Sequence, residues 1–204
     1  MPVTPNVDRA RLTLTSRTAL VLDNIRTADP ENEIAREIKA ITDKPEMTAE
    51  DRQRKDRLAY AGALYLDEDG ELIFPWANIS RALRSGAYLI GKASLAGAVG
   101  SGISASEVNF PLNYQGPPVG KLYEDERYRL RLMVNKNPSG KKAMVPSVRP
   151  VLPDWSMEFT VAVFNEVIGW DKFARAVAVT GELVGIGNAR RLGYGRFTAD
   201  IQKA

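Results

Sequence analysis

The sequence predicts an α+β protein built on an antiparallel sheet, because strand-like and helix-like segments alternate along a chain of ordinary globular composition. Apolar and β-branched residues dominate segments 11–22 and 157–164, as is typical of strands. Segments 76–90 and 170–180 instead repeat their apolar residues at helical spacing. With 204 residues, of which 44% are hydrophobic, the chain can bury a sizeable core, so we expect a single domain over residues 1–204.

Two polar helices follow the first strand. Isoleucines recur at helical spacing across residues 31–41. Thr48 and Asp51 form an N-cap signature for a second, very polar helix that runs through Leu58. Because this helical hairpin is so polar, we interpret residues 29–58 as an insertion on the core domain.

The middle of the chain predicts a hairpin, a helix and a loop. Residues 63–66 and 71–74 are expected to pair as a β-hairpin across the turn at residues 68–70. A helix over residues 76–90 has one apolar face, and the small, uncharged residues of segment 93–106 are typical of a mobile loop. The opposite face of the helix carries Arg81, Arg84 and Tyr88. Taken alone, its two arginines fit a solvated face better than a binding site.

The C-terminal part completes a recurrent element order. Residues 157–164 are expected to form a strand, residues 170–180 a helix capped by Gly181, and residues 194–201 the last strand. Without the polar insertion, the order is strand, helix, strand, strand, helix, strand. That order is typical of a ferredoxin-like or RRM-type fold, in which helices cover one face of an antiparallel sheet.

Basic residues concentrate in segment 127–149, which contains no acidic residue. Arginines alternate with apolar residues in segment 127–132, which predicts a strand followed by a turn and a returning strand. We name residues 127–149 the cationic hairpin. Its basic residues are Arg127, Arg129, Arg131, Lys136, Lys141, Lys142 and Arg149. Like charges at alternate strand positions repel each other, which favours an anionic partner, although a solvated face remains an alternative.

Four glycines and three arginines lie within residues 185–197, which we name the glycine-rich loop. Glycine permits a positive φ and a close approach of another backbone, and exposed N–H groups beside arginines suit a phosphate. The alternative is a purely structural turn before the last strand. The spacing matches neither the dinucleotide-binding fingerprint nor the P-loop. The candidate binding residues of this loop are Arg190, Arg191, Tyr194 and Arg196.

The composition excludes several chemistries. The chain has no cysteine and no histidine, which excludes disulfides, thiolate nucleophiles, zinc–thiolate sites and histidine-based triads. The net charge of +3 is too small to indicate a partner by itself. Polar sequence follows the N-terminus and no apolar run approaches the length of a membrane span. We therefore expect a cytoplasmic protein without a membrane contact, and we assign it no cofactor, metal site or catalytic residue.

Two motifs show a resemblance to a known superfamily. Residues 70–85, GELIFPWANISRALRS, are similar to the segment IPGSSLKGALRS of the RAMP superfamily, the CRISPR effector subunits that bind guide RNA. The glycine-rich loop resembles the hallmark loop of that superfamily, and the cationic hairpin resembles the thumb of its filament-forming backbone subunit. Trp76 and Ala77 stand where the superfamily has Gly-Ser, and the histidine of its guide-processing nucleases is missing. The resemblance therefore implies RNA binding without that route to catalysis.

The whole chain also resembles a family of phage and prophage proteins. This resemblance is carried by DN-x-R-x-ADP at residues 23–30, GALY at residues 62–65, VRP followed by Trp155, and the GIGN and GYGRF parts of the glycine-rich loop. It implies a phage-encoded protein that acts in a bacterial host cell.

These observations lead to one main hypothesis and two alternatives. In the main hypothesis, a non-catalytic protein binds single-stranded RNA or DNA through the cationic hairpin and the glycine-rich loop, supported by Arg81 and Arg84, with Tyr128 or Tyr194 stacked on bases. In the first alternative, a phage interaction protein mimics a CRISPR subunit and inhibits the host complex. In the second, a metal-dependent nuclease uses acidic residues, although turns explain most of them. The candidate carboxylates are Asp23, Asp29, Asp67 and Asp69.

Charge also suggests a mode of assembly. Segment 23–69 has 13 acidic and 8 basic residues, so its net charge of −5 complements the cationic hairpin. Within a monomer, the two surfaces would neutralise each other. Between neighbouring copies they would form a head-to-tail contact, which generates rings or open filaments. We therefore expect a homo-oligomeric ring or filament.

Overall fold

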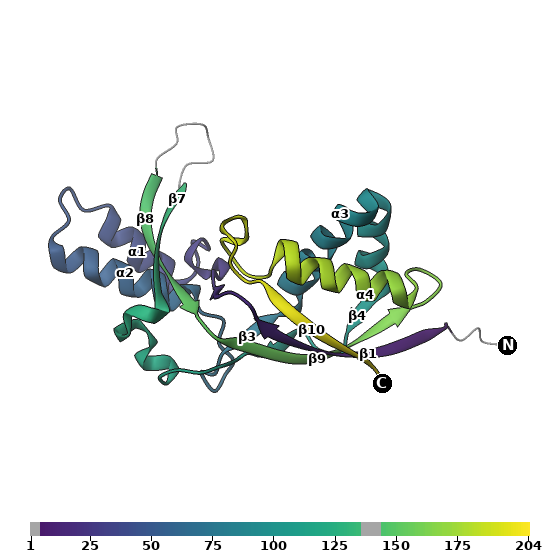
Figure 1. Cartoon of the computed structure of the whole chain (residues 1–204). Helices are drawn as coiled ribbons and strands as arrows, with labels where there is room; N and C mark the ends of the chain where they lie inside the picture. The colour runs from purple at the N-terminus through teal and green to yellow at the C-terminus, as the bar shows by residue number, and fades with distance from the viewer. Residues whose placement is uncertain (1–4, 136–143) are drawn as a thin grey trace.

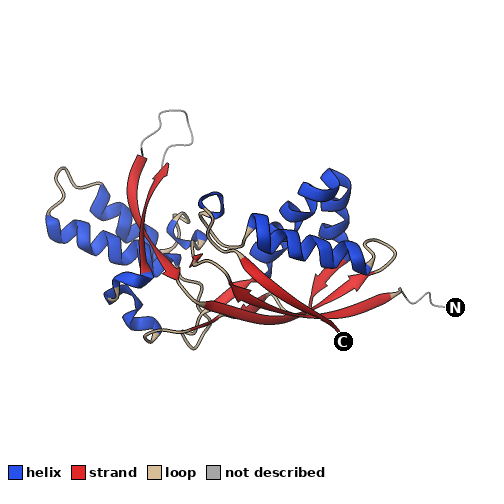
Figure 2. Cartoon of the chain, viewed as in Figure 1, coloured by secondary structure: helices blue, strands red, loops and turns tan. Residues whose placement is uncertain are grey.

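An antiparallel sheet carries helices on one of its faces (Figures 1 and 2). The computed structural model describes residues 5–135 and 144–204. Within that part of the chain the main sheet has five strands in the order β10-β1-β9-β4, with β6 also paired to β9. These strands are β1 (Val7–Ser16), β4 (Ile103–Ala105), β6 (Asn113–Tyr114), β9 (Trp155–Phe164) and β10 (Phe197–Lys203). The first strand of the chain, β1, therefore lies between β9 and the last strand, β10, and β4 lies on the other side of β9. This is the strand order of a ferredoxin-like fold, so the predicted α+β fold is confirmed.

The sheet buries one face and exposes the other. Alternate residues of β9, from Trp155 to Val163, are buried, and the residues between them are half-buried or exposed. On the buried face Leu12 of β1 lies opposite Phe159. On the outer face Arg11 and Glu158 form an ion pair of 3.6 Å. This alternation is what an antiparallel sheet with helices on a single face requires.

Two helices cover the buried face. They are α3 (Trp76–Gly102) and α4 (Trp170–Val179). The apolar face predicted for residues 76–90 is confirmed, since Ile79, Ala82 and Leu83 are buried. Gly86 lets α3 approach the end of α4, because a Cβ at this position would lie 2.1 Å from the Thr180 hydroxyl oxygen.

The mobile loop predicted for residues 93–106 is wrong. The chain breaks its helical path at Lys92, where φ is 54° and ψ is −153°, and then resumes as helix to Gly102 before β4 begins. Alanines favour helix, and Val99 and Gly102 are buried in this second part of α3. Packing and alanine content therefore outweigh the glycines on which the prediction rested.

The cationic hairpin forms a second, smaller sheet with the chain that leaves β1. Its strands are β7 (Arg129–Asn135) and β8 (Met144–Leu152), and β8 also pairs with β2 (Leu20–Val21). The polar helix α2 (Ala49–Ala63) lies beside β8, and the polar helix α1 (Glu33–Thr42) packs against α2 (Figure 1). The predicted N-cap is confirmed as a capping box, in which Thr48 and Asp51 each accept a backbone hydrogen bond from the other.

Three further expectations need correction. The strand predicted over residues 11–22 is split, because the chain leaves the main sheet after Ser16 and pairs with β8. Of the hairpin predicted at residues 63–74, only a single bridge between Leu66 and Leu72 forms, and β3 (Ile73–Pro75) pairs with β5 (Asn109–Pro111) instead. Gly181 does not cap α4. It lies in the π-turn η4 (Thr180–Val184), where a Cβ would be 2.3 Å from the Phe197 carbonyl oxygen.

Short 3-10 turns complete the described chain. They are η1 (Ile25–Thr27), η2 (Val119–Glu124), η3 (Glu126–Tyr128) and η5 (Arg190–Leu192). No helix within the described residues has the length and apolar character that crossing a membrane requires.

The close packing at Gly86 predicts a large difference between two glycine-to-alanine variants of α3. Gly86→Ala should lower the free energy of unfolding by about 1–3 kcal/mol, the usual cost of overpacking. Gly97→Ala should raise it by up to about 1 kcal/mol, because alanine favours helix and no atom lies within 4 Å of the new Cβ. Urea unfolding followed by circular dichroism measures both, and equal stabilities would contradict the helix contact.

Candidate nucleic-acid interface

The glycine-rich loop folds back on itself at very short range. All four of its glycines have positive φ, between 72° and 89°, as the sequence predicts. The Ile186 N–H donates to the Gly195 carbonyl oxygen at 2.9 Å. A Cβ on Gly195 would lie only 1.9 Å from the Ile186 carbonyl oxygen, so only glycine permits this crossing.

The same loop is tied to the link between β1 and β2. The Asn188 N–H donates to the Val21 carbonyl oxygen, and the Gly195 N–H to that of Ala19, both at 2.8 Å. The Thr18 hydroxyl donates to the Gly193 carbonyl oxygen and accepts from the Arg196 N–H, both at 2.9 Å. These contacts hold the tip of the loop in one place and thereby position its arginines.

A groove opens beside the loop, formed by two adjoining cavities of about 430 and 510 Å³. Both cavities are lined by Asp23, Tyr65, Asn78 and Arg81, so they lie next to each other. Residues 187–191 of the glycine-rich loop line the first cavity, and η1 with its neighbours lines the second. We name this space the central groove.

Hydrogen bonds order the floor of the central groove. Asn78 donates to the Tyr65 hydroxyl at 3.0 Å, and that hydroxyl donates to the Asp23 carbonyl oxygen at 2.9 Å. The Asp23 carboxylate accepts from the Asn188 side chain and lies 2.9 Å from Arg149 Nε. Burial raises the pKa of Asp23, and Arg149 opposes that shift. Asp23 thus connects the glycine-rich loop with β8 of the cationic hairpin.

Sequence reasoning did not identify Tyr65, Asn78 or Asn188 as site residues. Each lies within a segment that carried one of the family resemblances, and this was the only signal that could have found them.

Arginines without a counter-ion lie at the central groove and beside it. Arg81, Arg190 and Arg191 line the groove, Arg196 lies close enough to act on the charge of Arg190, and Arg84 follows Arg81 on α3. In the part of the chain that the structure describes, none of them forms an ion pair with a carboxylate. Burial and the nearby charges of Arg81 and Arg196 lower the pKa of the half-buried Arg190. Arg196 Nη1 is buried without a hydrogen-bond partner. This cluster lacks the anion that would balance it.

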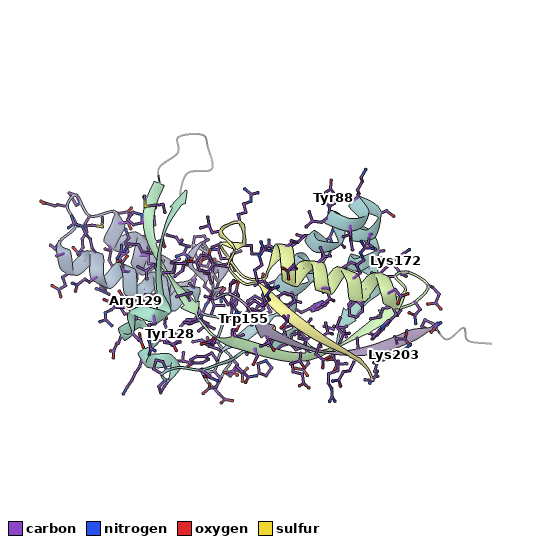
Figure 3. The ribbon with its side chains drawn as sticks, in the orientation of Figure 1. Tyr88, Tyr128, Arg129, Trp155, Lys172 and Lys203 are labelled. Atoms are coloured by element: carbon purple, nitrogen blue, oxygen red, sulfur yellow. The ribbon has the colours of Figure 1, made fainter. Side chains whose placement is uncertain are left out.

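The arginines of the cationic hairpin, in contrast, are paired with acids of the same chain. Arg127 lies in the turn η3, not in the predicted strand, and binds Asp125 at 2.7 Å. Arg129 lies 3.5 Å from Glu126 at the base of the hairpin (Figure 3). The other two ion pairs are Arg131 with Asp56 at 2.6 Å and Arg149 with Asp23. Lys136, Lys141 and Lys142 lie outside the described residues.

The two candidate stacking residues differ in exposure. Tyr128 is 4% exposed, and its hydroxyl donates to the Gln115 carbonyl oxygen at 2.6 Å, so the expectation that it stacks on a base is wrong. The strand alternation that suggested it does not extend to Tyr128, which ends η3. Tyr194 is half-buried between two glycines of the loop.

Part of the charge complementarity behind the assembly prediction is used within one chain. Asp56 of α2 pairs with Arg131 of β7, Asp23 pairs with Arg149 of β8, and α2 packs along β8. Head-to-tail assembly stays a prediction.

The carboxylates of the nuclease hypothesis have structural partners. Asp29 accepts a hydrogen bond from the Glu31 N–H, and Asp67 accepts from those of Asp69 and Glu71. These two residues cap turns, as their sequence context predicts. Within the described residues, no three acidic side chains gather as a possible metal site.

Comparison with known proteins supports the fold. No protein-family model matches the chain, and no curated protein sequence is similar to it. A subunit in the cryo-EM structure of the type III-B Cmr-beta complex bound to cognate target RNA is similar in structure, with a TM-score of 0.51 and 12% identity. The likeness covers 97% of this chain, which spans 61% of that subunit. Cmr6 from Pyrococcus furiosus matches over the full length of both chains at 9% identity, but with a TM-score of only 0.34. The first likeness supports a RAMP-like fold, and the phage-family resemblance finds no match.

Asp23 should make stability depend on pH in a recognisable direction. Because its pKa is raised, the native protein holds a proton that the unfolded chain releases at lower pH. The stabilisation from protonated Asp23 is complete below the unfolded pKa of about 3.9 and is lost as pH rises through the folded pKa. The free energy of unfolding of the wild-type protein, relative to that of Asp23→Asn, should therefore fall as pH rises above about 4. Urea unfolding at a series of pH values measures this difference.

Asp51 provides a control in which stability should change with pH in the opposite direction. Its hydrogen bond from Lys44 and its place in the capping box lower its pKa. Wild type should lose stability relative to Asp51→Asn only as pH falls below about 4. A pH-independent difference for Asp23→Asn would contradict the account of Asp23.

Proposed function

We propose that the chain binds single-stranded nucleic acid in the central groove and performs no chemistry on it. The observation that carries this proposal is the cluster of arginines without a counter-ion at Arg81, Arg190 and Arg196. A phosphate backbone supplies a row of anions, and guanidinium groups match phosphate oxygens in charge and geometry. Bound phosphates would balance the charge that the protein itself leaves unbalanced.

The fold supports RNA as the ligand to test first. The similar Cmr-beta subunit belongs to a complex bound to target RNA, although the likeness itself extends only to the fold. Contacts of this kind are mainly to phosphates, so we expect little sequence specificity. Asn78, Tyr65 and Asn188 on the groove floor offer hydrogen bonds to a sugar or base edge, and Tyr194 is a candidate stacking residue. Lys136, Lys141 and Lys142 stay proposed phosphate contacts.

The alternative of a phage protein that inhibits a host CRISPR complex rests on the same fold. Nothing in the central groove favours it over direct nucleic-acid binding. Pull-down from a lysate that contains such a complex separates the two functions, since direct binding needs no host protein.

Variants of paired and unpaired arginines should differ sharply in affinity. Arg190→Ala and Arg81→Ala should each weaken binding of a fluorescent single-stranded RNA. Each should also lower the slope of log Kd against the logarithm of the salt concentration by about 0.7, which is the value for one lost phosphate contact with a single strand. Arg127→Ala should leave both quantities unchanged, because Asp125 already neutralises this exposed arginine.

The same titration can reject the proposal. If Arg127→Ala loses as much RNA affinity as Arg190→Ala, the cationic hairpin is the binding surface instead of the central groove. No binding by the wild-type protein at low salt would exclude nucleic-acid binding altogether.

Assembly into a ring or filament stays a prediction. If copies line up along one strand, light scattering should show a species larger than a dimer once a long oligonucleotide is added. Charge reversal at Lys141 and Lys142 should weaken that assembly. A monomer at every concentration, with and without the oligonucleotide, would contradict it.

A further inference from the structure

One exposed face of α3 begins at the central groove. Arg81 lines the groove, Arg84 follows three residues later, and Tyr88 follows after four more. Residues at this spacing lie on one side of a helix, and all three are exposed. Tyr88 lies near the end of the first part of α3, four residues before the break at Lys92, and points away from the sheet (Figure 3). Arg81 and Tyr88 are separated by about 10 Å along the helix axis.

The electrostatics of this face suit a polyanion. α3 contains no acidic residue over its 27 positions, and Arg81, Arg84 and Lys92 are its charged residues. The Arg84 side chain also packs on the second part of α3, since a Cβ on Gly100 would lie 3.2 Å from Arg84 Nε. A packed guanidinium loses less conformational entropy on binding than a freely rotating one.

Tyr88 supplies an aromatic surface at the end of this row. Its side chain is 57% exposed, and within the described residues it makes no aromatic or cation–π contact. An exposed aromatic ring beside arginines is the combination with which proteins bind single strands, because every base has a face that can stack.

We propose that the bound strand leaves the central groove along α3, with phosphates on Arg81 and Arg84 and a base stacked on Tyr88. The distance from Arg81 to Tyr88 corresponds to about three stacked nucleotides at about 3.4 Å each. This inference rests on the proposed function, since it extends the same bound strand beyond the groove. It assigns to Tyr88 a role that is separate from those of the glycine-rich loop and the cationic hairpin.

Oligonucleotide length separates the groove from this extension. A strand of about 2 nucleotides bound in the groove is too short to reach Tyr88, because the stretch from Arg81 alone takes about three, whereas a strand of about 16 can fill the groove and also reach Tyr88. Tyr88→Ala should weaken binding of the longer RNA about fivefold or more, the usual effect of losing a base–aromatic stack, and leave the shorter RNA unaffected. Tyr88→Phe should retain wild-type affinity, because it keeps the ring.

Leu89→Ala is the matched control. Leu89 is the neighbouring residue and is 58% exposed, but it lies about 100° further round the helix. Its replacement should change the affinity for neither RNA. Arg84→Ala should weaken binding of the longer RNA more than binding of the shorter RNA.

Two negative results have different meanings. If Tyr88→Ala behaves like Leu89→Ala with both RNAs while Arg190→Ala weakens both, the strand does not follow α3 and the groove proposal stands. If Tyr88→Ala leaves binding of both RNAs unchanged but abolishes capture of a protein partner, Tyr88 belongs to a protein interface and the inference is overturned. If the wild-type chain binds neither RNA, the proposed function itself fails.

Discussion

The crossing of the backbone at Ile186 and Gly195 holds together parts of the chain that are distant in sequence. Gly195 must lack a side chain for the two segments to approach, and its N–H then reaches Ala19 in the link after β1. That link leads directly to Asp23 and to the start of the central groove. Because this close contact ties the glycine-rich loop to the link after β1, it fixes the position from which Arg190 lies near Arg81 of α3.

The arginines form two groups with different electrostatic states. Those of the cationic hairpin have carboxylate partners, such as Asp56 for Arg131, and exposed pairs of this kind add little to stability. The arginines at the groove have no carboxylate partner among the described residues. Arg190 is half-buried and lies near the charges of Arg81 and Arg196. Gathering like charges in a partly desolvated place is unfavourable for the free protein. An anion bound in the groove, as proposed above, would offset that cost.

Local chemistry was predictable from the sequence, and long-range pairing was not. The capping box at Thr48, the start of α3 and the positive φ of the loop glycines follow from the properties of single residues and their near neighbours. The ion pair between Arg131 and Asp56 joins residues 75 positions apart, and no local pattern encodes it. The helix after Lys92 was missed because its glycines suggest a loop, whereas burial of Val99 decides the outcome. The fold class could thus be predicted, but which arginines stay unpaired could not.

Asp23 shows how the two groups of arginines are linked. Its carboxylate contacts Asn188 of the glycine-rich loop and Arg149 of β8, and its carbonyl oxygen accepts from Tyr65 on the groove floor. Arg149 is 8% exposed, so this pair is an internal tie and not a surface contact. A buried charge that loses its partner is costly, which fixes β8 relative to the loop. The base of the cationic hairpin is therefore held at the edge of the groove.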